Sequence, residues 1–374
     1  MEGPWEHNYK RLLDSLEEEG IDTVILVSPQ NILYTTGIRE PGGAAVLSRN
    51  CGYTLIVPLL EYHRVNMQSP RYVELKAAYR GSEEGIEPDI PRRDVIAKTP
   101  VKAAIDIAKE CGGKVAADLQ WAPYPAAREL IDAGVTDSSR AISRLRSIKT
   151  SAELDLISKA VDKAQEILSK VLSLIEEGVS EAWMAGEIVR EALVRGWGPS
   201  FPPIVAFYSN TAYPHHTPGT TILGNPGPIL IDLGVVHEGY MSDMTRTLYY
   251  GKPGRVYSRI FESVLEAQSA AIDRIGPGVE AWEPDKEARL VLQREGLVKY
   301  FNHGLGHGVG VEIHEEPYLR PGSKTVLEPG MVVTVEPGVY IQGVLGVRIE
   351  DLVLVTPGGR RLLTRFTRVI DLAR

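Results

Sequence analysis

Hydrophobic positions in the first third of the chain alternate between helical and strand spacing. Large apolar side chains recur every three or four residues from Trp5 to Leu16, which predicts an amphipathic helix that Gly20 can end. Continuous apolar runs predict buried strands over residues 24–27, 53–57 and 115–117. Residues 124–132 have the spacing of another helix, and a last strand is expected near Val135. Such alternation is typical of a small α/β domain.

A polar, basic connector over residues 138–149 follows this region. Thr150 with Glu153 three positions later has the pattern of a capping box, which marks the start of a helix. The apolar stripe over residues 154–175 predicts one long amphipathic helix, closed by Gly178. A new structural unit therefore begins close to the connector.

The order of elements changes in the rest of the chain. A second helix is followed by strands rich in glycine and proline, a helix near residues 255–275 and a strand-rich carboxyl end. We therefore expect two domains, an α/β domain over residues 1–140 and a second domain over residues 141–374.

The charge and the cysteine content of the chain indicate which binding partners and which cellular compartment to expect. The sequence has 49 acidic and 41 basic side chains, and this excess of acid argues against nucleic acid or an anionic membrane as a partner. No uncharged apolar run approaches the roughly 20 residues of a membrane helix, and the amino terminus does not resemble a signal peptide. Cys51 and Cys111 have no recognised metal or redox spacing, so we expect free thiols in a cytoplasmic protein.

Four carboxylates lie at or next to segments that otherwise have the pattern of core strands: Asp232, Asp243, Glu336 and Glu350. Each has an ordinary explanation by itself, such as a strand end or an ion pair between Glu350 and Arg348. Together they are unusual, because an unpaired buried carboxylate costs several kcal/mol. Two divalent metal ions would balance four negative charges, and a hydroxide between them would be a nucleophile.

Five of the eight histidines lie in glycine- and proline-rich segments near these acids: His215, His216, His303, His307 and His314. The glycines of residues 302–310 do not form a dinucleotide loop, because Val309 occupies the last glycine position of that motif. The segment after His314 lacks the second histidine of a zincin helix, and the chain has no G-x-S-x-G motif. Glycine here is expected to let the backbone approach a metal and a substrate closely.

These motifs resemble those of the pita-bread metallopeptidases, in the same order and with matching gaps. The matching segments are residues 232–234 with 243–247, 303–310 with 314–317, 336–340 and 348–351. Residues 28–37 resemble the amino-terminal domain that prolidases, aminopeptidases P and creatinases share. The resemblance implies an α/β creatinase-like amino-terminal domain and an α+β pita-bread catalytic domain, assembled as a homodimer.

The resemblance also implies roles for individual residues. The two metals would be bound by Asp232, Asp243, His307, Glu336 and Glu350. Glu336 would in addition carry a proton from the attacking water to the leaving nitrogen. His215 and His314 would contact the substrate and the developing oxyanion. Arg348 would orient the acids, assisted by Tyr340 at the substrate site.

The implied function is hydrolysis of an Xaa-Pro dipeptide with manganese or cobalt, or alternatively zinc, as the metal. One residue departs from the family pattern, since Tyr318 stands where dipeptidases of this kind often have an arginine, and Arg320 follows two residues later. Aminopeptidase P activity on longer peptides is therefore the alternative. Two further alternatives are a metal-free creatinase-like hydrolase and a non-catalytic binding module, although the ligand set is complete.

Overall fold

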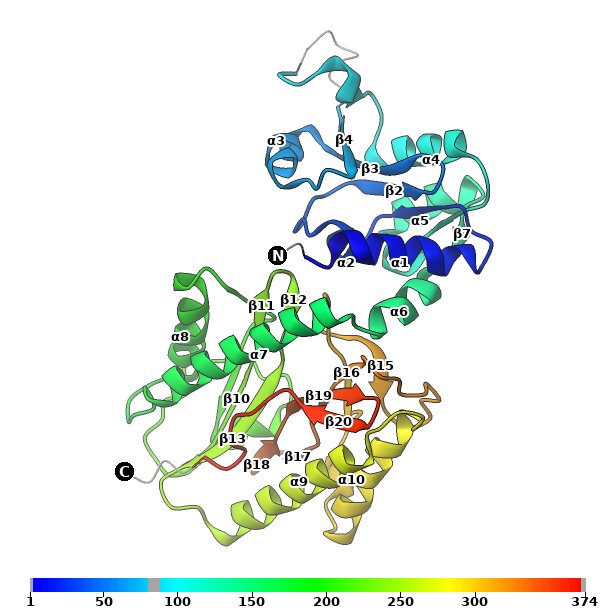
Figure 1. Ribbon diagram of the computed structural model, residues 1–374. Helices are drawn as coiled ribbons and strands as arrows, with labels where there is room; N and C mark the ends of the chain where they lie inside the picture. Colours follow the sequence, from blue (N-terminus) through cyan, green and yellow to red (C-terminus); the bar gives the residue numbers. More distant parts are fainter. Residues whose placement is uncertain (1–2, 80–87, 371–374) are drawn as a thin grey trace. The chain divides into compact units, whose positions relative to one another are not determined.

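The computed structural model describes residues 3–79 and 88–370 (Figure 1). The chain divides into two compact units, Met1–Arg146 and Ser147–Arg374. This division falls at the end of helix α6 (Ser139–Ser147), and the boundary expected near residue 140 lies within that helix. Each unit has its own hydrophobic clusters and is described separately.

Over residues 3–79 and 88–146, the amino-terminal unit has one seven-stranded sheet with the order β5-β4-β3-β2-β1-β6-β7. Strand β2 pairs antiparallel with both β1 and β3, and the remaining pairs are parallel. The central strands are buried on both faces, which explains their nearly continuous apolar runs. The strands are β1 (Thr23–Leu26), β2 (Ala44–Ser48), β3 (Gly52–Pro58), β4 (Val73–Ala78), β5 (Val95–Ile96), β6 (Val115–Ala117) and β7 (Thr136–Asp137).

Helices cover both faces of this sheet. Apolar residues of α1, α2, α3 and α6 pack in one cluster with the sheet, and those of α4 and α5 pack in a second cluster with it. The α/β character and the strands predicted at residues 24–27, 53–57 and 115–117 are confirmed. The helices are α1 (Trp5–Glu17), α2 (Pro29–Thr36), α3 (Leu59–Gln68), α4 (Pro100–Cys111) and α5 (Tyr124–Asp132).

The prediction of free cysteines is wrong. Cys51 and Cys111 form a disulfide, with Cα atoms 5.7 Å apart. The cysteines are 60 residues apart in sequence, but the turn before β3 and the last residue of α4 meet in space. Asn50 at the same turn donates a hydrogen bond to the Cys111 carbonyl (3.1 Å). Sequence spacing could not reveal this proximity, and the finding removes the argument for a reducing compartment.

Removal of the disulfide is expected to destabilise the amino-terminal unit. Cross-linking residues 60 positions apart restricts the unfolded chain, so Cys111→Ser should lower the free energy of unfolding by about 2–4 kcal/mol. Denaturant unfolding of both proteins measures the difference. A matched comparison in excess reductant is the control, because the difference should then disappear. Equal stability of the two oxidised proteins would contradict the prediction.

The second unit begins with the capping box that the sequence predicts. The Thr150 side chain accepts from the Glu153 backbone N–H, and the Glu153 carboxylate accepts from the Thr150 N–H. Helix α7 ends at Leu172 instead of continuing to Gly178, although Ile175 is still buried. Buried apolar residues thus continue into the turn after α7. The apolar pattern over residues 154–175 therefore predicts a helix longer than the observed one. None of the helices within residues 3–79 and 88–370 combines the length and hydropathy of a membrane span.

Four helices flank the strands of the second unit (Figure 1). Helices α7 and α8 pack in one hydrophobic cluster with β9, β10 and β13, whereas α9 and α10 pack in another with β16 to β19. The helices are α7 (Ser151–Leu172), α8 (Glu181–Val194), α9 (Arg255–Arg274) and α10 (Trp282–Arg294). This arrangement is α+β, as expected.

The strands of this unit form several small antiparallel sheets, of which the largest has the order β15-β14-β16-β19-β20. Strand β10 lies between β13 and β9 and is buried along its whole length. The strands are β8 (Gly198–Pro199), β9 (Ile204–Phe207), β10 (Gly227–Leu233), β11 (Val235–His237), β12 (Tyr240–Met241), β13 (Met244–Tyr250), β14 (Gly306–Gly308), β15 (Glu315–Leu319), β16 (Val332–Val335), β17 (Gly338–Ile341), β18 (Leu345–Arg348), β19 (Asp351–Thr356) and β20 (Gly359–Leu362).

Candidate metal centre and active site

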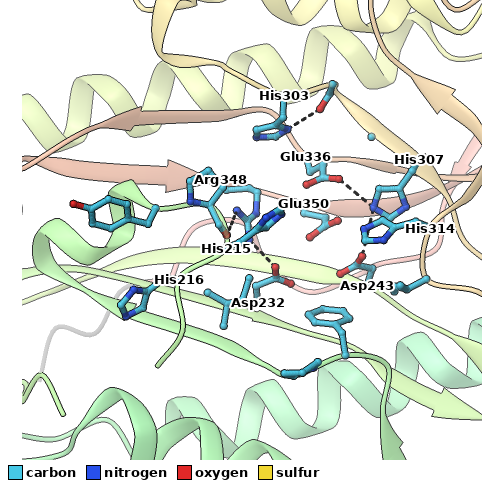
Figure 2. A pocket seen from close by; sticks show the side chains of 18 of the residues that line it. His215, His216, Asp232, Asp243, His303, His307, His314, Glu336, Arg348 and Glu350 are labelled. Atoms are coloured by element: carbon cyan, nitrogen blue, oxygen red, sulfur yellow. Dashed lines mark hydrogen bonds and ion pairs between the residues drawn. The ribbon is translucent and has the colours of Figure 1, made fainter. Parts of the chain in front are cut away.

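A cavity of about 950 Å³ in the second unit brings together most of the residues singled out in the sequence (Figure 2). Tyr340 does not line the cavity but lies behind it, in contact with Arg348. The predicted site residues that line it are His215, Asp232, Asp243, His307, His314, Glu336, Arg348 and Glu350. Segments more than 130 residues apart in sequence therefore share one wall.

Strand pairing explains why the acids meet. Asp232 lies near the end of β10 and pairs with Thr245 of β13, so that Asp243, just before β13, lies at the same end. Glu336 directly follows β16 and Glu350 directly precedes β19, and these two strands pair antiparallel. Antiparallel pairing places the end of one strand beside the start of the next.

Glycine allows β14 to bring His307 to this position. A Cβ atom on Gly306 would lie 2.1 Å from the Thr334 carbonyl oxygen, and one on Gly308 would lie 2.3 Å from the Glu316 carbonyl oxygen. Both distances are too short for any side chain. The close approach that we expected toward a ligand is thus an approach to the neighbouring strands β16 and β15.

His307 has the geometry of a metal ligand. Its Nδ1 is 3.1 Å from the Gly308 carbonyl oxygen, which can only accept, so Nδ1 carries a proton and Nε2 faces the cavity. Without a metal, Glu336 favours a second proton on Nε2 and raises the pKa of His307 in spite of burial, and a bound cation would replace that proton. Nε2 lies 3.3 Å from Glu336 Oε1 and 3.7 Å from Asp243 Oδ2. Ligand atoms of Asp243, His307 and Glu350 all lie within 4.8 Å of one another. One cation could contact all three.

The electrostatics of the cluster favour cations. Burial, and then the negative charges of Glu350, Asp232 and Glu336, raise the pKa of Asp243 well above its usual value. Burial and neighbouring acids likewise raise the pKa of Glu350. Burial would also raise the pKa of Glu336, but the hydrogen bond and charge of a protonated His307, together with the charges of His303 and Arg348, outweigh burial and lower that pKa to about 2. Several of these groups therefore cannot be ionised together without added positive charge.

The carboxylate of Asp232 gives independent evidence that the cluster suits a bound metal ion. Its Oδ2 accepts a hydrogen bond from Arg348 Nη2 (2.6 Å), but burial still raises its pKa. Within the described residues, its Oδ1 is buried and has no hydrogen-bond partner. A buried acceptor without a donor is costly, and a cation would satisfy it. The donor set therefore fits divalent metal.

Arg348 connects the residues around the acids. It donates to Asp232, to the Thr245 hydroxyl (3.0 Å) and to the Tyr340 hydroxyl (3.0 Å). Thr245 in turn donates to Glu350 Oε2 (2.7 Å). The buried guanidinium contacts Asp232 directly and Glu350 through the Thr245 hydroxyl, so it can orient both carboxylates.

His303 is a site residue to which the sequence pattern assigned no role. It lines the cavity, and its Nε2 lies 3.0 Å from the Tyr340 hydroxyl. Its Nδ1 faces the Gly304 carbonyl oxygen at 2.7 Å, so Nε2 accepts the Tyr340 proton. Burial lowers the pKa of His303 and favours this neutral form. The only sequence signal was its place in the same glycine-rich segment as His307.

The other histidines divide into two environments. The His314 ring lies 4.3 Å from the His307 ring, and burial and the neighbouring His307 lower its pKa. His215 points toward Arg348 and the acids, whereas the adjacent His216 lies apart from them (Figure 2). His216 Nε2 instead lies 2.9 Å from Glu181 Oε2. His215 and His314 are thus the imidazoles available to a bound substrate.

The cavity wall also carries Arg320, a cation without a carboxylate partner among the described residues. Tyr318 and Arg320 both line the cavity, and the Arg320 guanidinium lies 5.2 Å from the centre of the Tyr318 ring. Within the described part of the chain, the Arg320 side chain makes no ion pair or hydrogen bond. It contrasts with Arg348, which is fully paired.

Known proteins with the same architecture were compared with this chain. The profile described as "Creatinase/Prolidase N-terminal domain" matches residues 9–148, and "Metallopeptidase family M24" matches residues 155–357. An Xaa-Pro dipeptidase of Pyrococcus horikoshii is 32% identical over 370 residues, which cover 96% of this chain and 97% of the relative. The chain belongs to metallopeptidase family M24.

Solved structures agree with this assignment. The M24 chain superposes on an Xaa-Pro dipeptidase from Bacillus anthracis with a TM-score of 0.84 at 30% identity, covering 97% of this chain and 99% of that one. The prolidase from Pyrococcus horikoshii gives a TM-score of 0.82 at 31% identity, with the same coverage. The expected creatinase-like domain and pita-bread catalytic domain are confirmed, and membership of a metallopeptidase family implies the use of divalent metal.

Proposed function

We propose that this M24 enzyme is an Xaa-Pro dipeptidase that uses two divalent metal ions. The observation that carries the proposal is the convergence of five ligand-type side chains with two free imidazoles in one cavity: Asp232, Asp243, His307, Glu336, Glu350, His215 and His314. The relatives named Xaa-Pro dipeptidase cover nearly the whole chain, which supports this substrate class.

Bound metals would be held by Asp232, Asp243, His307, Glu336 and Glu350 and would supply an activated water and polarise the scissile carbonyl. Glu336 accepts the proton of the attacking water and passes it to the leaving proline nitrogen. His215 and His314 donate to the carbonyl oxygen as negative charge develops on it. Arg348 keeps Asp232 in place throughout.

The metals are manganese or cobalt in our proposal, with zinc as the alternative. Four carboxylates favour a hard cation, and the imidazole of His307 disfavours calcium or magnesium. The substrate is a small peptide with proline in second position, since a rigid ring without an amide hydrogen can be selected by shape. We further propose that the enzyme is a homodimer.

Arg320 is our candidate for the group that binds the free carboxylate of the dipeptide. The family position next to Pro317 is occupied here by Tyr318, whose ring centre lies 5.2 Å from the Arg320 guanidinium at the cavity wall. A guanidinium without a carboxylate partner can take a substrate carboxylate at no cost to another ion pair. A tripeptide such as Ala-Pro-Gly would place its carboxylate one residue further away.

Arg320→Gln is therefore expected to raise KM for Ala-Pro about 10- to 100-fold with little change in kcat, from the loss of one charge-assisted hydrogen bond. Steady-state kinetics on Ala-Pro and Ala-Pro-Gly measure this. Arg361→Gln on the exposed strand β20 is the matched control and should behave like the wild type. Rapid turnover of the tripeptide alone would reject the dipeptidase and favour aminopeptidase P.

A further inference from the structure

A buried carboxylate outside the metal cluster organises the segment that carries His215. Glu181, the first residue of α8, is fully buried. Its Oε1 accepts from the Phe207 backbone N–H (2.8 Å) and the Asn210 side chain (2.9 Å). Its Oε2 accepts from His216 Nε2 (2.9 Å) and the Gly219 backbone N–H (3.1 Å). One carboxylate thus ties together β9, the turn after it and the loop of residues 213–219.

The contacts of Glu181 are those of an ionised group. Burial alone would raise its pKa, but the hydrogen bonds from Asn210, His216 and two backbone amides outweigh burial and lower the pKa. Its place in the first turn of α8 adds the favourable field of the helix amino terminus. A charged acceptor with four donors is a strong anchor.

His215 lies between two anchors of the same loop. On one side, the Pro214 carbonyl accepts from Arg348 Nη1 (3.2 Å). On the other side, the His216 side chain is held by Glu181. The His216 ring is thereby kept apart from the acids while the His215 ring faces them (Figure 2). Pro214 and His215 lie in a turn that the His216 backbone N–H closes by donating to the Tyr213 carbonyl (3.1 Å), so fixing His216 also fixes the backbone of His215.

We propose that Glu181 is a positioning residue for His215, acting through His216 and the backbone of residues 213–219. The proposal rests on the proposed function, in which His215 contacts the substrate. Glu181 itself does not line the cavity and has no contact with the reacting atoms. Its effect on catalysis is therefore expected to pass entirely through the imidazole of His215.

Glu181→Gln is the sharpest single test, because all four neighbours of the carboxylate are donors. In one orientation the glutamine NH₂ faces the Gly219 N–H, and in the other it faces the Phe207 N–H. Neither backbone amide can become an acceptor, so the loop must shift. We expect kcat/KM for Ala-Pro to fall about 10²-fold, the effect of a misplacement of about 1 Å.

A double mutant separates positioning from general damage. In the His215→Ala background, Glu181→Gln should change kcat/KM by no more than about two-fold, since residues that act as a unit are not additive. The matched control is Glu191→Gln, which removes a buried carboxylate from the same helix where it pairs with Arg195. That control should retain wild-type kinetics. A further 10²-fold loss in the double mutant would overturn the proposal.

A second pair of variants covers the case in which Glu181→Gln does not fold. His216→Phe keeps a ring but removes the donor to Glu181, and we expect about a ten-fold fall in kcat, from the lost hydrogen bond. His216→Gln keeps a donor and should restore most of that activity. Equal activities of the two variants would contradict the proposed role of Glu181.

Crystal structures make the test independent of the enzyme's substrate. In the His216→Phe variant, the His215 ring should turn away from Asp232 and Glu350, whereas in His216→Gln it should keep its place. If the wild type failed to cleave any Xaa-Pro peptide, the proposed function would be rejected and this structural comparison would still decide the positioning role. An unchanged His215 in His216→Phe would overturn the inference.

Discussion

Glu336→Gln is expected to lower kcat for Ala-Pro by about 10²–10⁴-fold, the usual contribution of a positioned proton-transfer group. An amide has nearly the same shape as the carboxylate but cannot accept the proton of the attacking water. The neighbouring positive groups outweigh burial and lower the pKa of Glu336 to about 2, so the native group is an ionised carboxylate at neutral pH and can act as the proton acceptor. Steady-state kinetics and metal content of the purified variant measure the effect.

The matched control for this variant is Glu262→Gln on the exposed face of α9, which removes one charge far from the cavity. It should retain wild-type kcat. A Glu336→Gln enzyme within ten-fold of wild-type activity would remove Glu336 from the mechanism. Retained metal with lost activity would assign the loss to proton transfer, and lost metal would assign it to ligation.

Removal of the metals is expected to abolish hydrolysis and to destabilise the second unit. Metals that bind only the folded chain stabilise it by about 4 kcal/mol at a concentration 1,000 times their Kd. Chelation, followed by addition of manganese, cobalt or zinc separately, tests both effects through activity and thermal unfolding. Activity that survives exhaustive chelation and dialysis would favour the metal-free, creatinase-like alternative.

The stability of the metal-free enzyme should depend on pH in a defined direction. The pKa values of Asp243 and Glu350 are raised well above those of the unfolded chain, and that of Asp232 is also raised. Groups of this kind stabilise the fold at low pH, and the stabilisation is lost as the pH rises through their raised pKa values. Glu336, with its lowered pKa, acts in the opposite direction.

Because three groups outweigh one, the metal-free enzyme should melt at a higher temperature in weak acid than at alkaline pH. Added metal should remove this dependence, since it compensates the ionised acids. Thermal unfolding at several pH values with and without metal makes the measurement. A metal-free enzyme that gains stability steadily with rising pH would contradict the assignment of a repulsive acidic cluster.

The local sequence pattern correctly predicted those elements whose structure is determined by their own residues. The capping box at Thr150 and Glu153 needs only four consecutive residues, and it is present as expected. The buried strands of the amino-terminal unit were visible because both of their faces are apolar. The end of α7 was not visible, because Ile175 is buried after the helix has ended.

The amino-acid sequence alone determined the family, the two-domain architecture and the acids and histidine expected to bind metal, because motif order and misplaced charge are properties of the linear chain. Only the tertiary structure decided which distant residues meet. It joined Cys51 to Cys111, placed His303 beside Tyr340, and showed that Glu181 contacts the loop of His215. The physical reason is that strand pairing and loop return bring these groups together, and neither periodicity nor composition encodes such distances.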